Sequence, residues 1–200
     1  MTKTFIGKVT LAPALLAVTG ALIAAPASET STLKNQHQTG LTVITPEPAK
    51  RAEASQLLER IQANAVQLEK DSGALASSSG LKLSRQSQAN YLMQVRERIN
   101  QNGKQLASFE KIKAEAAPWQ QQAYNRITPI ARDLARNTEA AINHLNENPA
   151  YRFAPQYQDT LQAIAVNAGE MKDNVNAFLA LGAAQQKVHT LQQELAESRS

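Results

Sequence analysis

The hydrophobic positions of this chain repeat at spacings of three and four residues over four long segments. In the first, from residue 46 to a turn predicted at Ser77–Gly80, the apolar positions form one stripe along a helix. They are Ala54, Leu58, Ile61, Ala65, Leu68 and Leu75. Thr45 can cap the free amides at the start of this helix, and Pro46 suits its first position.

The second segment, from about Ser84 to Ala116, carries one polar residue in its apolar stripe. The stripe contains Leu92, Val95, Ile99, Leu106, Phe109 and Ile112. Asn102 takes the position between Ile99 and Leu106, beside Gly103. We expect a hydrated or solvent-facing turn there, although a buried amide that sets the helix register or binds a ligand is the alternative.

Proline residues divide the second half of the chain. Pro118 predicts either a tight corner or a kink, and a third helix follows to about Asn146, with a bend expected at Pro129. Its inward positions are Ala123, Ile127, Ile130, Leu134, Ala141, Ile142 and Leu145. The string "NENPAYRFAP" predicts a connection in which Pro155 opens the next helix.

The fourth helix, from about Pro155 to Glu197, changes its apolar stripe near the middle. Up to Phe178 the spacing is strictly four and three, through Tyr157, Leu161, Ile164, Ala168, Met171 and Val175. Beyond Phe178 the stripe shifts to Leu181, Ala184, Val188, Leu191 and Leu195. This break separates a bundle-facing half from a tail that we expect to protrude.

Together these patterns predict an all-α fold, an elongated and mostly antiparallel bundle of about four long helices with heptad-like packing, over residues 46–200. If the other helices end level with Phe178, the tail stripe is exposed, and it predicts self-association or binding of another protein through the C-terminal helix. The alternative is that the first helix or residues 75–84 fold back over it.

The N-terminus has the layout of a secretory signal peptide. Lys3 and Lys8 precede an uncharged run over residues 9–24, and Ala25-Pro26-Ala27 matches a cleavage site. The run is about 16 residues long, whereas a membrane span needs roughly 20. We therefore expect a signal peptide at 1–27, a flexible leader at 28–45, and a periplasmic or secreted protein with no stable membrane span after cleavage. An uncleaved N-terminal anchor is the alternative.

Charge and cysteine content narrow the function further. The formal charge is +4, and removal of Lys3 and Lys8 lowers it to +2 because residues 1–27 contain no acid. The remaining charges alternate in sign, so we expect no nucleic-acid binding. The chain has no cysteine, which excludes disulfides, thiolate zinc sites and thioether attachment of haem.

Few side chains are placed for catalysis. The three histidines, His37, His144 and His189, have no carboxylate or second histidine at the helical i+4 spacing of a metal site, and the chain has no H-E-x-x-H or E-x-x-H motif. We therefore expect that the protein is not an enzyme, that it has no catalytic residues, and that it binds no metal or cofactor. The alternative is a small-ligand or haem-binding bundle, in which Met93 or Met171 would face His189.

Aromatic residues near the two proline corners are the remaining candidates for a binding site. They are Trp119, Tyr124, Tyr151, Phe153 and Tyr157. We expect them to close the ends of the bundle, with a small-molecule or partner site as the alternative. The size and the Gln-rich helical faces are similar to those of periplasmic helical stress chaperones, but the L-T-x-x-Q signature of that family is absent, so the sequence is assigned to no known family. The sequence therefore predicts an exported helical interaction or scaffold protein without naming its process.

Overall fold

The computed structural model describes residues 48–78, 84–147 and 154–199. Within these ranges the chain forms four α-helices, α1 (Pro48–Ser78), α2 (Arg85–Ile112), α3 (Pro118–Glu147) and α4 (Pro155–Glu197), and a short 3-10 helix, η1 (Lys113–Glu115). These helices occupy the four segments in which the hydrophobic spacing predicts them, so the predicted all-α bundle is confirmed. The predicted signal peptide, leader, Thr45 cap and His37 lie outside the described residues.

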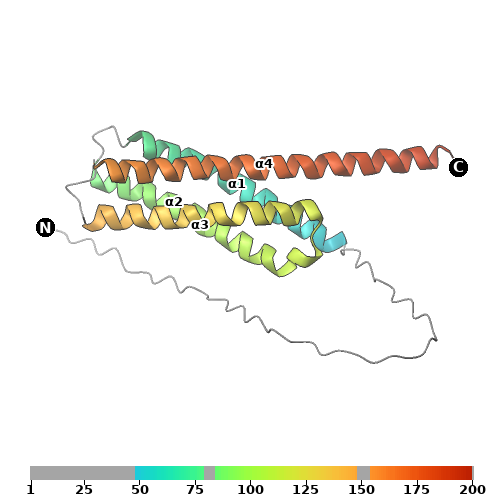
Figure 1. The fold of residues 1–200 in the computed structure, drawn as a ribbon, viewed down its shortest axis with the longest axis horizontal. Helices are drawn as coiled ribbons and strands as arrows, with labels where there is room; N and C mark the ends of the chain where they lie inside the picture. Colours follow the sequence, from blue (N-terminus) through green and yellow to red (C-terminus); the bar gives the residue numbers. More distant parts are fainter. Residues whose placement is uncertain (1–47, 79–83, 148–153, 200) are drawn as a thin grey trace, which may run out of the picture. The chain divides into compact units, whose positions relative to one another are not determined.

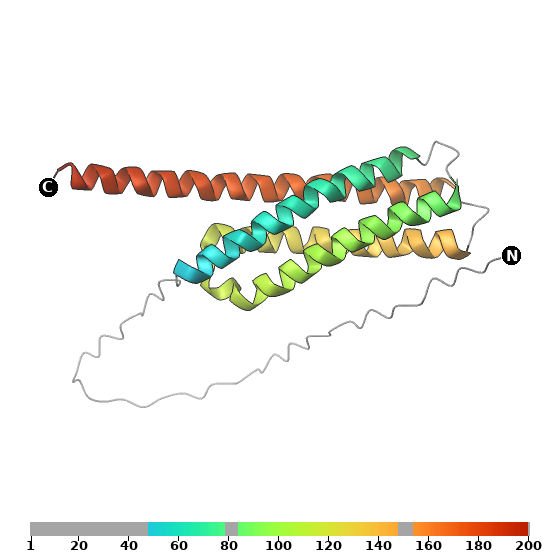
Figure 2. The ribbon, with the colours of Figure 1, turned by 180° about the vertical axis from the view of Figure 1, so that it is seen from behind.

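Each helix packs against two neighbours. α1 contacts α2 and α4, and α3 likewise contacts α2 and α4. Consecutive helices run in opposite directions, so both neighbours of each helix are antiparallel to it (Figure 1). Seen from behind, α1 and α2 lie side by side and cross the pair formed by α3 and α4 at an angle (Figure 2).

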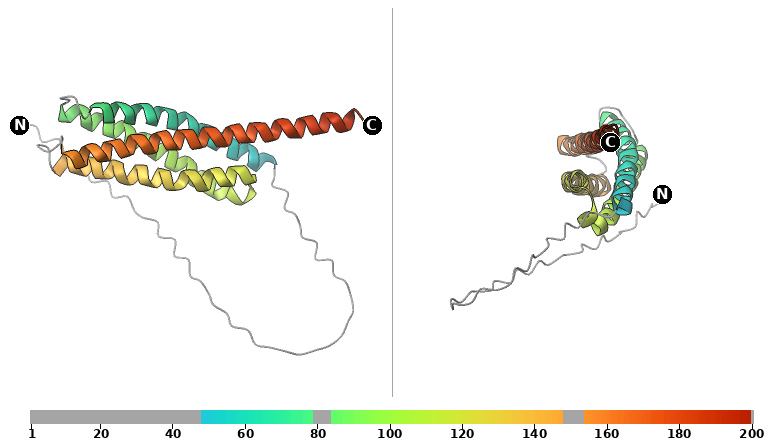
Figure 3. Two further views of the ribbon diagram at one scale, coloured as in Figure 1. Left: turned by 45° about the horizontal axis from the view of Figure 1, so that its top comes forward. Right: turned by 90° about the vertical axis from the view of Figure 1, so that its right-hand side faces the viewer.

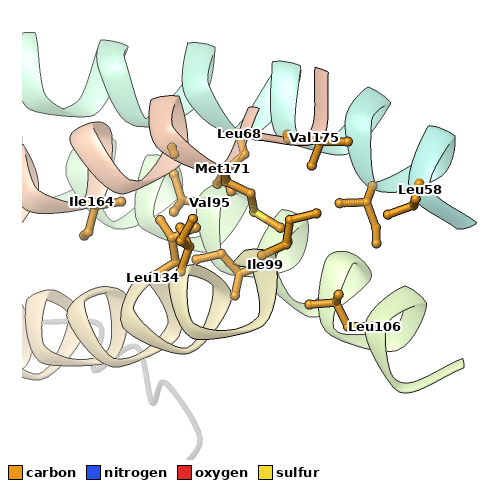
Figure 4. Close-up of a cluster of buried hydrophobic side chains, with 14 of the residues drawn as sticks. Leu58, Leu68, Val95, Ile99, Leu106, Leu134, Ile164, Met171 and Val175 are labelled. Atoms are coloured by element: carbon orange, nitrogen blue, oxygen red, sulfur yellow. The ribbon is translucent and has the colours of Figure 1, made fainter. Parts of the chain in front are cut away.

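The predicted apolar stripes meet in the centre of this bundle. Figure 4 shows Leu68 from α1, Val95 and Ile99 from α2, Leu134 from α3 and Met171 from α4 pointing toward one another. All the predicted stripe positions of α1 and α2 are buried, and so are those of α3 and of α4 up to Phe178, except Ile142 and Phe178, which are partly buried. Four helices that each bury one stripe against two neighbours explain why the spacing of three and four persists.

Proline is the first residue of three of the helices, α1 at Pro48 and also α3 and α4. α3 begins at Pro118 and α4 at Pro155, where the missing amide proton costs no helical hydrogen bond. Pro129 lies inside α3, which continues on both sides of it. The predicted connection after α3 lies mostly at 148–153, outside the described residues.

The chain between α2 and α3 is a tight corner, the first of the two arrangements predicted at Pro118. α2 ends at Ile112, earlier than expected, and η1 leads to an extended Ala116. The buried Gln120 holds this corner, because its Oε1 accepts a hydrogen bond from the Ala117 amide at 2.8 Å. Its Nε2 donates to the Arg51 carbonyl at 2.8 Å and to Ser55 Oγ at 2.9 Å. The corner is therefore attached to the first turns of α1.

The fourth helix is longer than the other three. It has 43 residues, against 28 to 31 in α1, α2 and α3. At about 1.5 Å per residue it is roughly 65 Å long, which is about 20 Å longer than each of the other three helices. Among the helices that the structure describes, none combines the length and the apolar character that a membrane crossing requires.

Candidate interaction surface

Helix α4 is held by its neighbours up to a point near Gly182. On the α1 side, Lys172 Nζ donates to Glu69 Oε1 at 2.7 Å and Gln62 Nε2 donates to Asn176 Oδ1 at 2.7 Å. The hydrogen bond to Glu69 raises the pKa of the Lys172 ammonium above its ordinary value. On the α3 side, Arg126 Nη2 lies 3.2 Å from Glu170 Oε1. These contacts fix the rotation of α4 about its own axis.

Trp119 marks the place where α4 leaves the bundle. The indole, in the first turn of α3, lies directly against Gly182, where an added Cβ would stand 2.4 Å from Trp119 Cζ2. Beyond this contact α4 projects past the ends of α1 and α3 (Figures 1 and 3). The projecting segment, defined here as residues 183–197, consists entirely of exposed residues.

The apolar residues of α4 from Leu181 onward are exposed, as the tail prediction requires. Leu181 is 41% exposed, Val188 55%, Leu191 48% and Leu195 59%, whereas Val175 inside the bundle is fully buried. We call Leu181, Ala184, Val188, Leu191 and Leu195 the tail stripe. The alternative that α1 folds back over these side chains does not hold for the described residues of α1.

The tail stripe faces away from the bundle. Residues of an α-helix turn by about 100° each, so residues seven apart point within about 20° of one another. Gly182, seven residues after the buried Val175, accordingly faces the bundle and meets Trp119. Measured from Val175, the tail stripe lies about 160–240° around the helix. The side of the segment that continues the core-facing stripe is polar, with Gln186, His189 and Gln193.

The charges balance over residues 183–199, which are the projecting segment and the two residues after it. Lys187 and Arg199 are basic and Glu194 and Glu197 are acidic, and all four are exposed. None of the ion pairs found among the described residues includes any of the four. The stripe is therefore an apolar strip with a neutral balance of charge around it.

Asn102 is buried, so the prediction of a solvent-facing turn is wrong. Its Nδ2 donates to Met171 Sδ at 3.7 Å, and its Oδ1 has no hydrogen-bond partner among the described residues. The reason is geometric: α1 and α3 pack on either side of α2, and Met171 of α4 reaches Asn102 across the centre of the bundle, so the stripe position between Ile99 and Leu106 stays inside. Four further polar residues are buried, and the spacing of apolar residues does not predict them: Ser72, Gln88, Gln120 and Thr138.

The structure does not bring together the residues of the haem alternative. Met171 and His189 lie on the same helix, 18 positions apart, which is about 27 Å along its axis. Met171 is fully buried, while His189 is exposed on the projecting segment. Met93 is exposed and lies on a different helix, in the first half of α2. Within the described ranges, no three His, Asp or Glu side chains form a group that could hold a metal ion.

The aromatic residues separate into two groups at opposite ends of the bundle. Tyr124 stacks on Phe109 with ring centroids 5.3 Å apart, and Lys113 Nζ lies 4.6 Å from the centre of the Tyr124 ring. Burial, reinforced by Glu110, raises the pKa of Tyr124 above its ordinary value. Trp119 lies in the same region, at the start of α3. This group closes the bundle where α4 leaves it.

The second aromatic group lies where α3 ends and α4 begins. Tyr157 is buried and stacks on His144 at 4.9 Å between ring centroids, and its hydroxyl lies 3.5 Å from Gln88 Oε1. Burial raises the pKa of Tyr157 to about 12. Tyr151 and Phe153 lie outside the described residues.

A surface depression of about 380 Å³ lies along the α1–α2 seam. Its lining includes Glu53, Arg60 and Lys104 and is mainly polar.

No protein-family model, curated protein or solved structure matches the chain. The tail stripe is distinguished from the rest of the described surface by its row of exposed apolar side chains.

Proposed function

We propose that this protein is a non-enzymatic interaction or scaffold protein, exported to the periplasm or secreted, that binds another protein helix through the projecting end of α4. The observation that carries the proposal is the tail stripe, which is apolar, about half exposed and directed away from its own bundle. Exposed apolar strips of this length on soluble proteins are normally interaction surfaces.

The bundle supports this role by holding the segment rigidly. An isolated helix of 15 residues is only marginally stable in water. Here the segment continues a helix that is anchored by α1 and α3 and by the Trp119–Gly182 contact. A partner therefore meets a helix that is already formed, and less conformational entropy is lost on binding.

Export is proposed from the N-terminal sequence alone. Lys3, Lys8, the uncharged run and the Ala25-Pro26-Ala27 boundary are the features on which it rests. We expect the mature chain to begin at Ser28. Mass spectrometry of the protein purified from the envelope or the culture medium tests this, and a cytoplasmic protein that retains Met1 would refute it.

Substitutions in the tail stripe test the interaction itself. The triple variant Val188→Gln, Leu191→Gln and Leu195→Gln keeps good helix formers while removing the apolar surface. We expect it to lose the association that the unaltered chain shows by crosslinking in its compartment and by sedimentation. Because these residues lie outside the core, the melting temperature should change little.

Two controls make this test specific. Gln186→Ala and Gln193→Ala alter the opposite side of the same segment, and association should persist in that variant. A chain truncated after Ala183 retains the Trp119–Gly182 contact and should remain folded without associating. If truncation unfolded the whole bundle while the full-length protein stayed monomeric and uncrosslinked, the segment would be part of the folded core and the proposal would fail.

A further inference from the structure

We propose that the partner of the tail stripe is the tail stripe of a second copy of this chain, running antiparallel, with Lys187 of each copy facing Glu194 of the other. This inference rests on the proposed function and names its partner. It follows from the spacing, the charges and the direction of the stripe.

The spacing of the stripe suits a two-helix pairing. Its residues follow one another at intervals of three, four, three and four, the repeat of a coiled-coil seam. In an antiparallel pair centred between Val188 and Leu191, each Val188 packs opposite Leu191 of the second copy. Each Ala184 then packs opposite Leu195 of the second copy. Small residues meet large ones, so the layers have similar volumes, whereas a parallel pair would place Ala184 opposite Ala184.

The charges select this register. Lys187 directly precedes Val188 and Glu194 directly precedes Leu195, so both lie on the same edge of the stripe. In antiparallel helix pairs, like edges face each other, and the proposed register sets Lys187 against Glu194 of the second copy twice. A shift by one heptad in either direction would instead set Lys187 against Lys187 or Glu194 against Glu194.

Neither charge has an opposite charge to pair with on its own helix. The positions three and four residues from Lys187 hold alanine, threonine and leucine. Those around Glu194 hold threonine, leucine, serine and the like-charged Glu197. Neither side chain takes part in an ion pair among the described residues.

The direction of the stripe favours the antiparallel arrangement. The outward face of α4 continues from the tail stripe into the bundle, where it carries Glu170, paired with Arg126, and Asp173, paired with Lys172. A parallel pair would bring the two bundles and these charged faces side by side, whereas the antiparallel pair keeps the bundles at opposite ends of the joined segments. A membrane surface is a poorer match, because interfacial helices are usually rich in Lys and Arg, whereas the projecting segment has one Lys and two Glu.

Charge reversal tests the register in the full-length protein. Lys187→Glu and Glu194→Lys should each raise the dimer dissociation constant by about tenfold at low salt, because two attractive contacts become repulsive. The double variant should restore the original value. Lys111→Glu, on the polar face of α2, is the matched control and should leave dimerisation unchanged. Sedimentation over a concentration series measures these constants.

Engineered disulfides test the orientation, since the chain has no cysteine of its own. Val188→Cys and Leu191→Cys, carried on chains of different size and mixed, should give mainly the mixed disulfide. In the proposed register, Val188 of one chain lies about 4.5 Å along the axis from Val188 of the second chain, and the same holds for Leu191. That displacement puts the like pair beyond comfortable disulfide distance.

The outcomes separate this inference from the proposed function. Disulfides that join identical positions, formed in preference to the mixed 188–191 disulfide, would overturn the antiparallel pairing. A double charge variant that failed to restore the original dissociation constant would overturn it as well. A full-length protein that stays monomeric to about 500 µM, a range that covers weak interfaces, would overturn the second copy as partner. In that case, crosslinking to another protein that still depended on Val188, Leu191 and Leu195 would leave the proposed function standing. A chain that neither dimerised nor crosslinked to another protein through the tail stripe would overturn both this inference and the proposed function.

Discussion

Gly182 provides a direct test of where α4 leaves the bundle. A Cβ at this position would stand 2.4 Å from Trp119 Cζ2, 2.7 Å from Cη2 and 2.8 Å from Cε2. Carbon atoms cannot approach so closely, so Gly182→Ala forces the indole to move. The ring cannot yield by moving one end alone, because three of its atoms are too close.

Two opposing effects set the magnitude of this change. Alanine is about 1 kcal/mol better than glycine inside a helix, whereas forcing extra volume into a packed contact costs about 1–3 kcal/mol. We therefore expect Gly182→Ala to lower the free energy of unfolding by up to about 2 kcal/mol. Gly103→Ala is the matched control, because Gly103 is exposed within α2 and nothing lies within 4 Å of its added Cβ. It should stabilise the protein by about 1 kcal/mol.

Urea unfolding and tryptophan fluorescence measure both parts of this prediction. Trp119 is the only tryptophan in the chain, so its emission reports the displaced ring without interference. We expect a red shift in Gly182→Ala and an unchanged spectrum in Gly103→Ala. If both variants were equally stabilised and both kept the original emission, Trp119 would not pack on Gly182. The assigned start of the projecting segment would then be wrong.

Three further predictions concern the core. Ile99→Asp should lower the free energy of unfolding by several kcal/mol because it buries a charge. Lys111→Ala, on the polar face of the same helix, should change it by no more than about half a kcal/mol. Equal shifts in melting temperature would contradict the assignment of faces. Asn102→Leu should raise the free energy of unfolding by about 1 kcal/mol, because it removes a buried amide oxygen without a partner; a loss in urea unfolding would show that the amide is satisfied. The raised pKa of Tyr157 gives stability that is complete below about pH 10 and is lost as the pH rises to about 12. Denaturant titrations from pH 9 to 12 measure this loss of stability, and in Tyr157→Phe the loss should be smaller by roughly 2–3 kcal/mol. If the variant lost as much stability at alkaline pH as the unaltered chain, this prediction would be wrong.

The hydrophobic spacing was sufficient to predict the helices, because an amphipathic helix is a local pattern that repeats every few residues. Leu58, Val95, Leu134 and Ile164 occupy stripe positions and are buried in the structure. The same spacing showed that the apolar positions shift near Phe178. It therefore predicted the tail stripe as a separate surface before any neighbouring helix was known.

Polar residues in the core could not be assigned in this way. Asn102 and Gln120 have side chains that satisfy either water or a buried partner, and their surroundings decide which. Gln120 is buried because the corner at Ala116–Pro118 places it against the carbonyl of Arg51, about 70 positions earlier in the chain. Such a contact depends on how α1 and α3 are packed together, and no local pattern records it.

Four amphipathic helices, their apolar stripes and the apolar tail can all be predicted from the amino-acid sequence, since each depends on residues a few positions apart. The level at which the bundle ends emerges from the packed fold, because it depends on the contact between Trp119 and Gly182, 63 positions away. The packed fold also separates the aromatic residues into two ends and leaves the tail stripe without an intramolecular neighbour among the described helices. Exposure is a property of packing between helices, and a sequence pattern specifies only which side of each helix is apolar.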